Sequence, residues 1–145
     1  MAKAKQVHEK IQRMLANRFG SVKIDKDGDF VVKNESAFTF VSTIQWNDDQ
    51  TIVQIRCPML VDVPITAELT RWIAVEGQRF LFGRTYLNPN EDGKAGWVYF
   101  QHNLLGDDLD EPELMDALDA VALTSNKLDN ELKTKFGGEL FGTDD

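Results

Sequence analysis

The chain has 145 residues, of which 42% are hydrophobic and 28% charged, and it carries a formal net charge of −8 at pH 7. These values are typical of one globular domain and exclude an intrinsically disordered chain. The negative charge argues against general nucleic-acid binding, which needs a cationic face, and the lack of any run of about 18 apolar residues excludes a membrane-spanning helix.

Two features of the sequence indicate a cytoplasmic protein. Residues 1–15, MAKAKQVHEKIQRML, have neither the uninterrupted apolar core nor the cleavage site of a secretory signal. Cys57 is the only cysteine, so no internal disulfide can form, as expected in a reducing compartment.

Charge is distributed unevenly along the chain. Residues 1–26 contain seven basic side chains against two acidic ones, whereas residues 103–145 contain twelve acidic side chains against three lysines. The two ends either attract each other, within the fold or across a dimer, or form two solvated faces. The small energies of surface ion pairs favour the solvated faces.

The first half of the chain is predicted to form a helix followed by a β-meander. Val7, Ile11, Leu15 and Phe19 recur every four residues, as in an amphipathic helix, and Gly20 can end it. Alternating segments then predict strands at residues 21–24, 30–34, 37–46 and 51–61. This alternation indicates a sheet with one covered and one accessible face.

The second half is predicted to contain two helices and two strands. A helix over 65–76 is closed by Gly77, strands follow at 79–87 and 96–104, and a long helix covers 110–135.

This order of elements predicts an α+β fold: an antiparallel meander sheet with three helices, in the order α-β-β-β(-β)-α-β-β-α. Residues 1–138 are expected to form a single domain. Residues 139–145, ELFGTDD, are expected to form a flexible acidic tail.

The dense cluster of acids in residues 106–114, GDDLDEPEL, is explained by a helix start. Asp110 can cap the helix with Glu113 at the capping-box spacing, and Pro112 falls in the first turn, where its missing N–H costs nothing. No metal site is predicted there.

A second acidic stretch, DKDGDF at residues 25–30, looks like the start of a calcium-binding loop but is predicted to be a hairpin turn. The calcium loop needs a glycine at its sixth position and a glutamate at its twelfth, and these positions hold Phe30 and Ser36. The Asp27-Gly28 pair is typical of a tight turn between strands. We therefore expect neither a metal ion nor a cofactor.

The reactive side chains form no recognisable catalytic motif. His8 is predicted to lie on the solvated side of the first helix, and Cys57 in the core. His102 is interpreted as structural, and the alternative is a small hydrolase built on His102 with Asp107 or Asp108. We therefore expect no enzymatic activity.

Aromatic residues are concentrated in the predicted strands. Most are expected in the core, but three helices can cover only one face of the sheet well. Part of an apolar sheet surface should therefore meet a second copy or an extended peptide. The aromatic residues concerned are Phe38, Phe40, Trp46, Phe80, Phe82, Tyr86, Trp97 and Tyr99.

Three stretches carry a family resemblance: the basic first helix, VDVPITAELTRWIAVEGQRFLFGRTYL at residues 61–87, and the stretch from GWVYFQHNLLGDDLDEPEL to KFGG at residues 96–138. With the element order, they make nearly the whole chain similar to type III secretion chaperone-like proteins of the YbjN type. The resemblance implies a small acidic cytoplasmic protein, commonly dimeric and without enzymatic activity. It also implies that client stretches are held against apolar patches on the sheet and the first helix. A role in secretion itself is not implied.

The resulting hypothesis is a non-enzymatic peptide- or protein-binding chaperone or regulator, with a client segment along a sheet edge. The expected partners are a protein or peptide client and a second copy of the chain. The residues predicted to bind the peptide are Ile11, Leu15, Phe40, Trp46, Trp97 and Tyr99. The residues predicted to form the dimer contact are Trp72, Ile73 and Leu81. The alternative is a homodimeric interaction module whose own dimer uses up the apolar surface.

Overall fold

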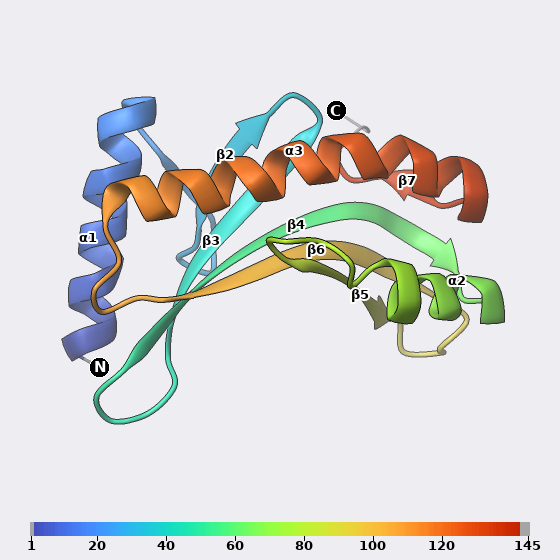
Figure 1. The fold of residues 1–145 in the computed structure, drawn as a ribbon, viewed down its shortest axis with the longest axis horizontal. Coiled ribbons are helices and arrows are strands. Elements are labelled where there is room, and N and C mark those ends of the chain that lie inside the picture. Colours follow the sequence, from blue (N-terminus) through green and yellow to red (C-terminus); the bar gives the residue numbers. More distant parts are fainter. Residues whose placement is uncertain (1, 143–145) are drawn as a thin grey trace.

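A computed structural model of the chain describes residues 2–142 and shows an α+β fold with an antiparallel sheet (Figure 1). It confirms the predicted fold class and element order, and it adds a short last strand. In chain order the helices and strands are α1 (Ala2–Phe19), β1 (Lys23–Ile24), β2 (Phe30–Asn34), β3 (Ala37–Gln45), β4 (Thr51–Pro64), α2 (Ala67–Arg71), η1 (Trp72–Glu76), β5 (Arg84–Pro89), β6 (Ala95–Leu105), α3 (Glu111–Phe136) and β7 (Glu139–Leu140).

The sheet has a continuous strand order, β1-β2-β3-β4-β6-β5, and β7 pairs with β4 outside this path. β3 pairs with β4 only as far as Phe40 and Arg56. Beyond that point β4 continues with two irregularities, between Pro58 and Leu60 and between Leu60 and Val63. Bulges of this kind bend a strand and interrupt its pairing. The edge of β4 that β3 leaves is therefore free to accept β7.

One hydrophobic core lies between the helices and one face of the sheet, here called the covered face. In Figure 1, α3 runs along β4 and β6, α1 stands near one end of α3, and α2 lies toward the other end. Burial of apolar side chains from the helices and the strands stabilises this arrangement. The largest fully buried side chains are Ile11, Leu15, Phe30, Val41, Val53, Ile55, Leu60, Val63, Leu69, Phe100, Leu114 and Leu132.

The ends of the two long helices follow from local sequence. Asp110 caps α3, and its carboxylate accepts a hydrogen bond from the Glu113 N–H at 2.9 Å. Gly20 follows α1 with a φ of 84°, and Gly137 follows α3 with a φ of 86°, which are left-handed conformations that favour glycine. The acidic cluster of residues 106–114 thus starts a helix, as predicted.

The basic first helix and the acidic second half meet at the surface of the fold. Arg18 pairs with Asp119 at 2.9 Å, and Lys3 pairs with Asp107 at 3.8 Å. Each of these side chains is between 24% and 46% exposed, so solvent screens the two ion pairs and their net contribution to stability is small.

The helix predicted over 65–76 begins as an α-helix and continues as a π-helix. Thr66 caps α2 by accepting a hydrogen bond from the Leu69 N–H at 3.1 Å. At the end of η1, the Gly77 N–H donates to the carbonyl of Trp72, five residues back, at 2.8 Å. A Cβ at Gly77 would overlap the Oγ1 of Thr85. The end of η1 packs so closely on β5 that only a residue without a side chain fits at position 77.

The strand predicted at 79–87 begins only at Arg84. Before it, Phe80 packs edge-to-face on Phe100 with the ring centroids 5.3 Å apart. Gly83 has a φ of 100°, and a Cβ there would lie 2.7 Å from the Phe100 ring. The first part of the predicted strand is instead a loop held on the core, because Gly83 turns the chain close to Phe100.

The chain after α3 differs from the predicted flexible tail. Residues 139–140 pair antiparallel with β4 as strand β7. The next amide, that of Phe141, donates to the carbonyl of Met59 at 3.2 Å. The predicted boundary is corrected because the free edge of β4 supplies hydrogen-bond partners for this segment. Residues 143–145 of the predicted tail lie outside the described residues.

The acidic loop between β1 and β2 is a hairpin, as predicted. The Asp25 carboxylate accepts hydrogen bonds from the N–H groups of Asp27 and Asp29, both at 2.9 Å. Asp29 also pairs with Arg56 at 3.1 Å. Within residues 2–142, no group of His, Cys, Asp and Glu side chains is arranged to hold a metal ion, and no helix is long and apolar enough to cross a membrane.

Candidate functional site

The face of the sheet opposite the core, here called the open face, carries a band of half-buried aromatic side chains. Side chains alternate between the two faces along a strand, and directly paired residues share a face. Val41, Val98 and Phe100 are fully buried in the core, so their strand neighbours point to the open face. The aromatic residues of the open face are Phe38 and Phe40 on β3, Tyr86 on β5, and Trp97 and Tyr99 on β6.

On β5 and β6 the rings stack on one another. Tyr86 and Tyr99 lie with their centroids 4.8 Å apart and their planes 3° from parallel. Tyr99 and Trp97 are 6.0 Å apart at an angle of 29°. Burial raises the pKa of both tyrosines above the ordinary value, so their hydroxyl groups are neutral hydrogen-bond donors at physiological pH.

Phe141, which follows β7, connects these rings to those of β3. Its ring meets Phe38, Phe40 and Trp97 edge-on, with centroid separations of 5.6, 6.0 and 5.7 Å. Such edge-to-face contacts stabilise by about 0.5–1.5 kcal/mol each. The five strand rings, Phe38, Phe40, Tyr86, Trp97 and Tyr99, are here called the aromatic face, and Phe141 lies against them and makes the band continuous.

The open face is cationic, although the chain as a whole is acidic. The strand register places Lys23, Lys33, Arg56 and Arg84 on this face. Arg56 is partly neutralised by Asp29, and Asp25 lines the same groove as Lys23 and Lys33, so four cations face two acids. The positive charge of the face would attract an acidic partner.

Two of these cations lie over aromatic rings. The guanidinium of Arg56 is 5.3 Å from the centre of the Phe40 ring, and the ammonium of Lys33 is 5.1 Å from that of Phe38. Arg56 also donates a hydrogen bond to the Ser42 hydroxyl at 2.7 Å. These contacts hold the cations beside the rings, where they add to the binding surface.

Three of the residues predicted to bind a peptide, Phe40, Trp97 and Tyr99, lie together on the aromatic face. Trp46 follows the end of β3, is 51% exposed, and donates its backbone N–H to the Gln50 carbonyl at 3.2 Å. No ring contact within residues 2–142 joins it to the aromatic face.

Ile11 and Leu15 require a correction. Both are fully buried, because the apolar stripe of α1 packs on the covered face and contributes to the core. They are therefore not part of an exposed binding surface. His8 also differs from expectation, since its ring stacks on Phe30 with the centroids 4.4 Å apart.

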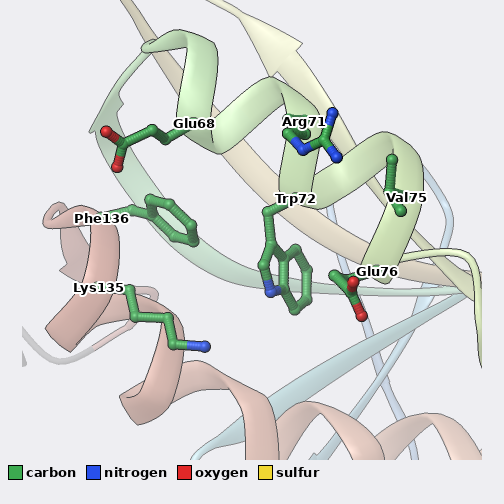
Figure 2. Close-up of a pocket in the computed structure, with 7 residues that line it drawn as sticks. All are labelled: Glu68, Arg71, Trp72, Val75, Glu76, Lys135 and Phe136. Carbon is green, nitrogen blue, oxygen red and sulfur yellow. The ribbon is translucent and has the colours of Figure 1, made fainter.

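The residues predicted to form a dimer contact occupy two places. Trp72 and Ile73 are half-buried in η1, whereas Leu81 is 96% exposed in the loop before β5. Figure 2 shows Trp72 pointing toward the end of α3, where its ring lies 6.4 Å from that of Phe136.

These two rings line a pocket of about 350 Å³. The other lining residues are Glu68, Arg71, Val75, Glu76 and Lys135 (Figure 2). The two acids and two bases of the lining give the pocket no net formal charge.

The residues of the hydrolase alternative have separate partners. His102 packs edge-to-face on Phe82 at 5.8 Å, and burial lowers its pKa. Asp107 accepts hydrogen bonds from the Thr51 N–H at 3.2 Å and from the Thr51 hydroxyl at 2.8 Å. Asp108 is exposed. The Asp107 hydrogen bonds hold the chain at the start of α3. In the described part of the chain, no hydrogen bond or ion pair joins His102 to Asp107 or Asp108.

Cys57 is fully buried on the covered face, and burial raises its pKa to about 11. At pH 8 only about one thiol in a thousand would then be ionised. We predict that 5,5′-dithiobis(2-nitrobenzoate) modifies the folded protein at least about a hundredfold more slowly than the urea-unfolded chain. Equal rates in the two states would contradict the buried position.

Helices on one face of an antiparallel sheet define a two-layer domain of the α+β class. The chain belongs to the family described as "T3SS (YopN, CesT) and YbjN peptide-binding chaperone 1", whose model matches residues 4–144. The resemblance stated from the sequence is thereby confirmed. No curated protein matches the chain.

Several solved structures have a similar fold, among them the following two. YbjN from E. coli superposes with a TM-score of 0.60 at 9% identity, over 92% of this chain and 94% of that chain. A chain of the ExsC–ExsE complex superposes with a TM-score of 0.56 at 13% identity, over 85% of this chain and 93% of that chain. At such identities the similarity shows the fold.

Sequence reasoning missed two members of the site, Phe141 and Arg56. Phe141 falls in the segment predicted to be a flexible tail, and the two glycines before Glu139 are a local signal only for a turn of the chain. Nothing in the sequence distinguishes Arg56 from other surface cations. Its role depends on its pairing with Phe40 across two strands.

Proposed function

We propose that this protein is a peptide-binding chaperone that holds an extended segment of a client polypeptide on the aromatic face. The observation that carries the proposal is the continuous band of half-buried rings from β5 to β3 on the face opposite the core. Rings of this kind bind apolar side chains of many shapes, since aromatic groups contribute large contact areas at low entropic cost.

The groups that converge on this face support a binding role and not an enzymatic one. They are aromatic rings with cations beside them, which provide apolar contact and attraction for acidic segments. The proposed setting is the cytoplasm, where the lone thiol of Cys57 would remain reduced.

The test measures the binding of short synthetic peptides, each with one apolar cluster in a polar sequence, by fluorescence anisotropy. We expect micromolar binding to the unmodified protein and at least about tenfold weaker binding to Tyr99→Ala, because a large aromatic side chain near the centre of an interface contributes about 2 kcal/mol. Trp46→Ala is the matched control, since this exposed ring lies outside the aromatic face, and it should bind as the unmodified protein does.

The proposal fails if no peptide of the set binds at micromolar concentration, or if Trp46→Ala and Tyr99→Ala weaken binding equally. Sedimentation equilibrium addresses the homodimer that we also propose, with the exposed Leu81 as its candidate contact. A dimer that binds peptides supports both proposals. A dimer that binds none, and in which Tyr86 and Tyr99 are protected from iodination, indicates a client-free interaction module.

A further inference from the structure

The chain's own C-terminal segment lies against the aromatic face. After α3, Gly137 and Gly138 have φ values of 86° and 82°, and they lead the chain back to the sheet. β7 then adds to the free edge of β4, and the Phe141 ring enters the gap between β3 and β6. This is the manner in which an extended peptide adds to a sheet: backbone pairing along an edge, and alternate side chains in apolar sites.

The two side chains of this segment point to opposite faces. Leu140 packs against the hydrophobic core, whereas Phe141 contacts three rings of the aromatic face. Gly142 comes next, and a Cβ at this position would lie 2.6 Å from the Phe38 ring. A residue without a side chain therefore lets the backbone pass directly over Phe38.

The segment pairs with the sheet over a short stretch of backbone, beside the packing of Leu140 and Phe141 and a surface ion pair between Glu139 and Lys133 at 3.4 Å. β7 consists of two residues, and the Phe141 amide adds one hydrogen bond to β4. The Phe141 side chain is only half-buried. Short edge strands with partly exposed side chains can open locally without unfolding the rest of a domain.

A groove next to Phe141 provides room and charged side chains for a peptide longer than residues 139–142. This groove of about 510 Å³ begins at Phe141 and Gly142, and its charged lining residues are Lys23, Lys33 and Asp25, two cations against one acid. In the sequence, the residues after Gly142 are Thr-Asp-Asp. An acidic stretch after an aromatic residue would match the cations of this groove.

We propose that residues 139–142 are the protein's own occupant of the aromatic face, and that a client displaces them with an extended segment in which an aromatic residue directly follows an aliphatic one. This inference rests on the proposed function and specifies the client. The tethered segment competes with every client, because its effective concentration at the face is in the millimolar range.

The experiment uses the full chain with Trp46→Phe and Trp72→Phe, so that Trp97 is its only tryptophan. The probe is the peptide GGELFGTDD, which has the sequence of residues 137–145, and the control peptide has alanine in place of phenylalanine. In this background Phe141→Ala should shift the Trp97 emission to longer wavelength, because the ring 5.7 Å away is removed. The probe should bind Phe141→Ala at least about tenfold more tightly than the parent and restore the emission. The control peptide should bind neither protein.

Phe82→Ala is the matched control variant, because this half-exposed ring packs on His102 and not on the aromatic face. It should leave the Trp97 emission and the affinity for the probe unchanged. The inference is overturned if Phe141→Ala leaves the emission unchanged or binds the probe no more tightly than the parent. If the parent still binds the apolar peptides of the previous subsection, the proposed function stands without this inference. If neither protein binds any peptide, both fail.

Discussion

Phe100→Ala is expected to lower the free energy of unfolding by about 3–5 kcal/mol, which is the usual cost of removing a fully buried phenylalanine. Phe100 lies in the middle of β6, is 0% exposed, and pairs with Cys57 of β4 and Thr85 of β5. The substitution would leave a cavity under α3 and remove the ring on which Phe80 rests. Since domains of this kind unfold at a cost of about 5–15 kcal/mol, a large part of the stability would be lost.

Urea unfolding followed by circular dichroism measures this change. Phe82→Ala is a suitable control, because Phe82 is 51% exposed and its removal leaves the core intact. The urea midpoint of Phe82→Ala should change little, since substitutions at exposed positions usually change the free energy of unfolding by less than about 0.5 kcal/mol. Similar losses for the two variants would show that the core is not centred on β6.

Gly138→Ala is the second substitution with a large expected effect, a loss of about 2–5 kcal/mol in the free energy of unfolding. A left-handed φ of 82° costs a residue with a Cβ about 1–2 kcal/mol. The added Cβ would also lie 2.8 Å from the Val61 carbonyl and 2.7 Å from a Val63 methyl group, and overpacking of this kind costs about 1–3 kcal/mol. Detachment of β7 would relieve the clash, so the Phe141 amide should lose its protection from hydrogen exchange.

Gly20→Ala separates the cost of the left-handed backbone from the cost of the close contacts. Gly20 has a similar φ of 84°, but no atom would lie within 4 Å of an added Cβ. This variant should be destabilised only by the cost of the left-handed conformation. The Phe141 amide should remain protected from hydrogen exchange. If the two variants lose equal stability and the amide stays protected in both, the close approach of Gly138 to β4 does not control the docking of β7.

Most of the fold could be predicted from the sequence because local patterns specify its elements, whereas the family was predicted from a resemblance to known proteins. A spacing of four between apolar residues determines α1, and alternation determines β3, β4 and β6. The capping residues Asp110 and Glu113 likewise mark the start of α3 without reference to the rest of the chain. Alternation likewise assigns Phe40, Trp97 and Tyr99 each to one side of its strand, and their role in peptide binding stays a prediction.

Errors arose where a contact between distant residues overrides a local pattern. The strand expected from residue 79 is a loop, because Phe80 and Gly83 pack on Phe100. The second helix widens to a π-helix where Gly77 packs against Thr85. Both differences concern how closely an element approaches the sheet, which a periodicity cannot show.

The sequence by itself determined the class of fold, the helix ends and the side of each strand on which its aromatic residues lie, because these depend on neighbours within a few positions. Only the tertiary structure decided that Ile11 and Leu15 belong to the core and that Phe141 joins Phe38, Phe40 and Trp97. The physical reason is that β3 leaves β4 at Phe40. The edge exposed there needs hydrogen-bond partners, and the chain that returns from α3 supplies them.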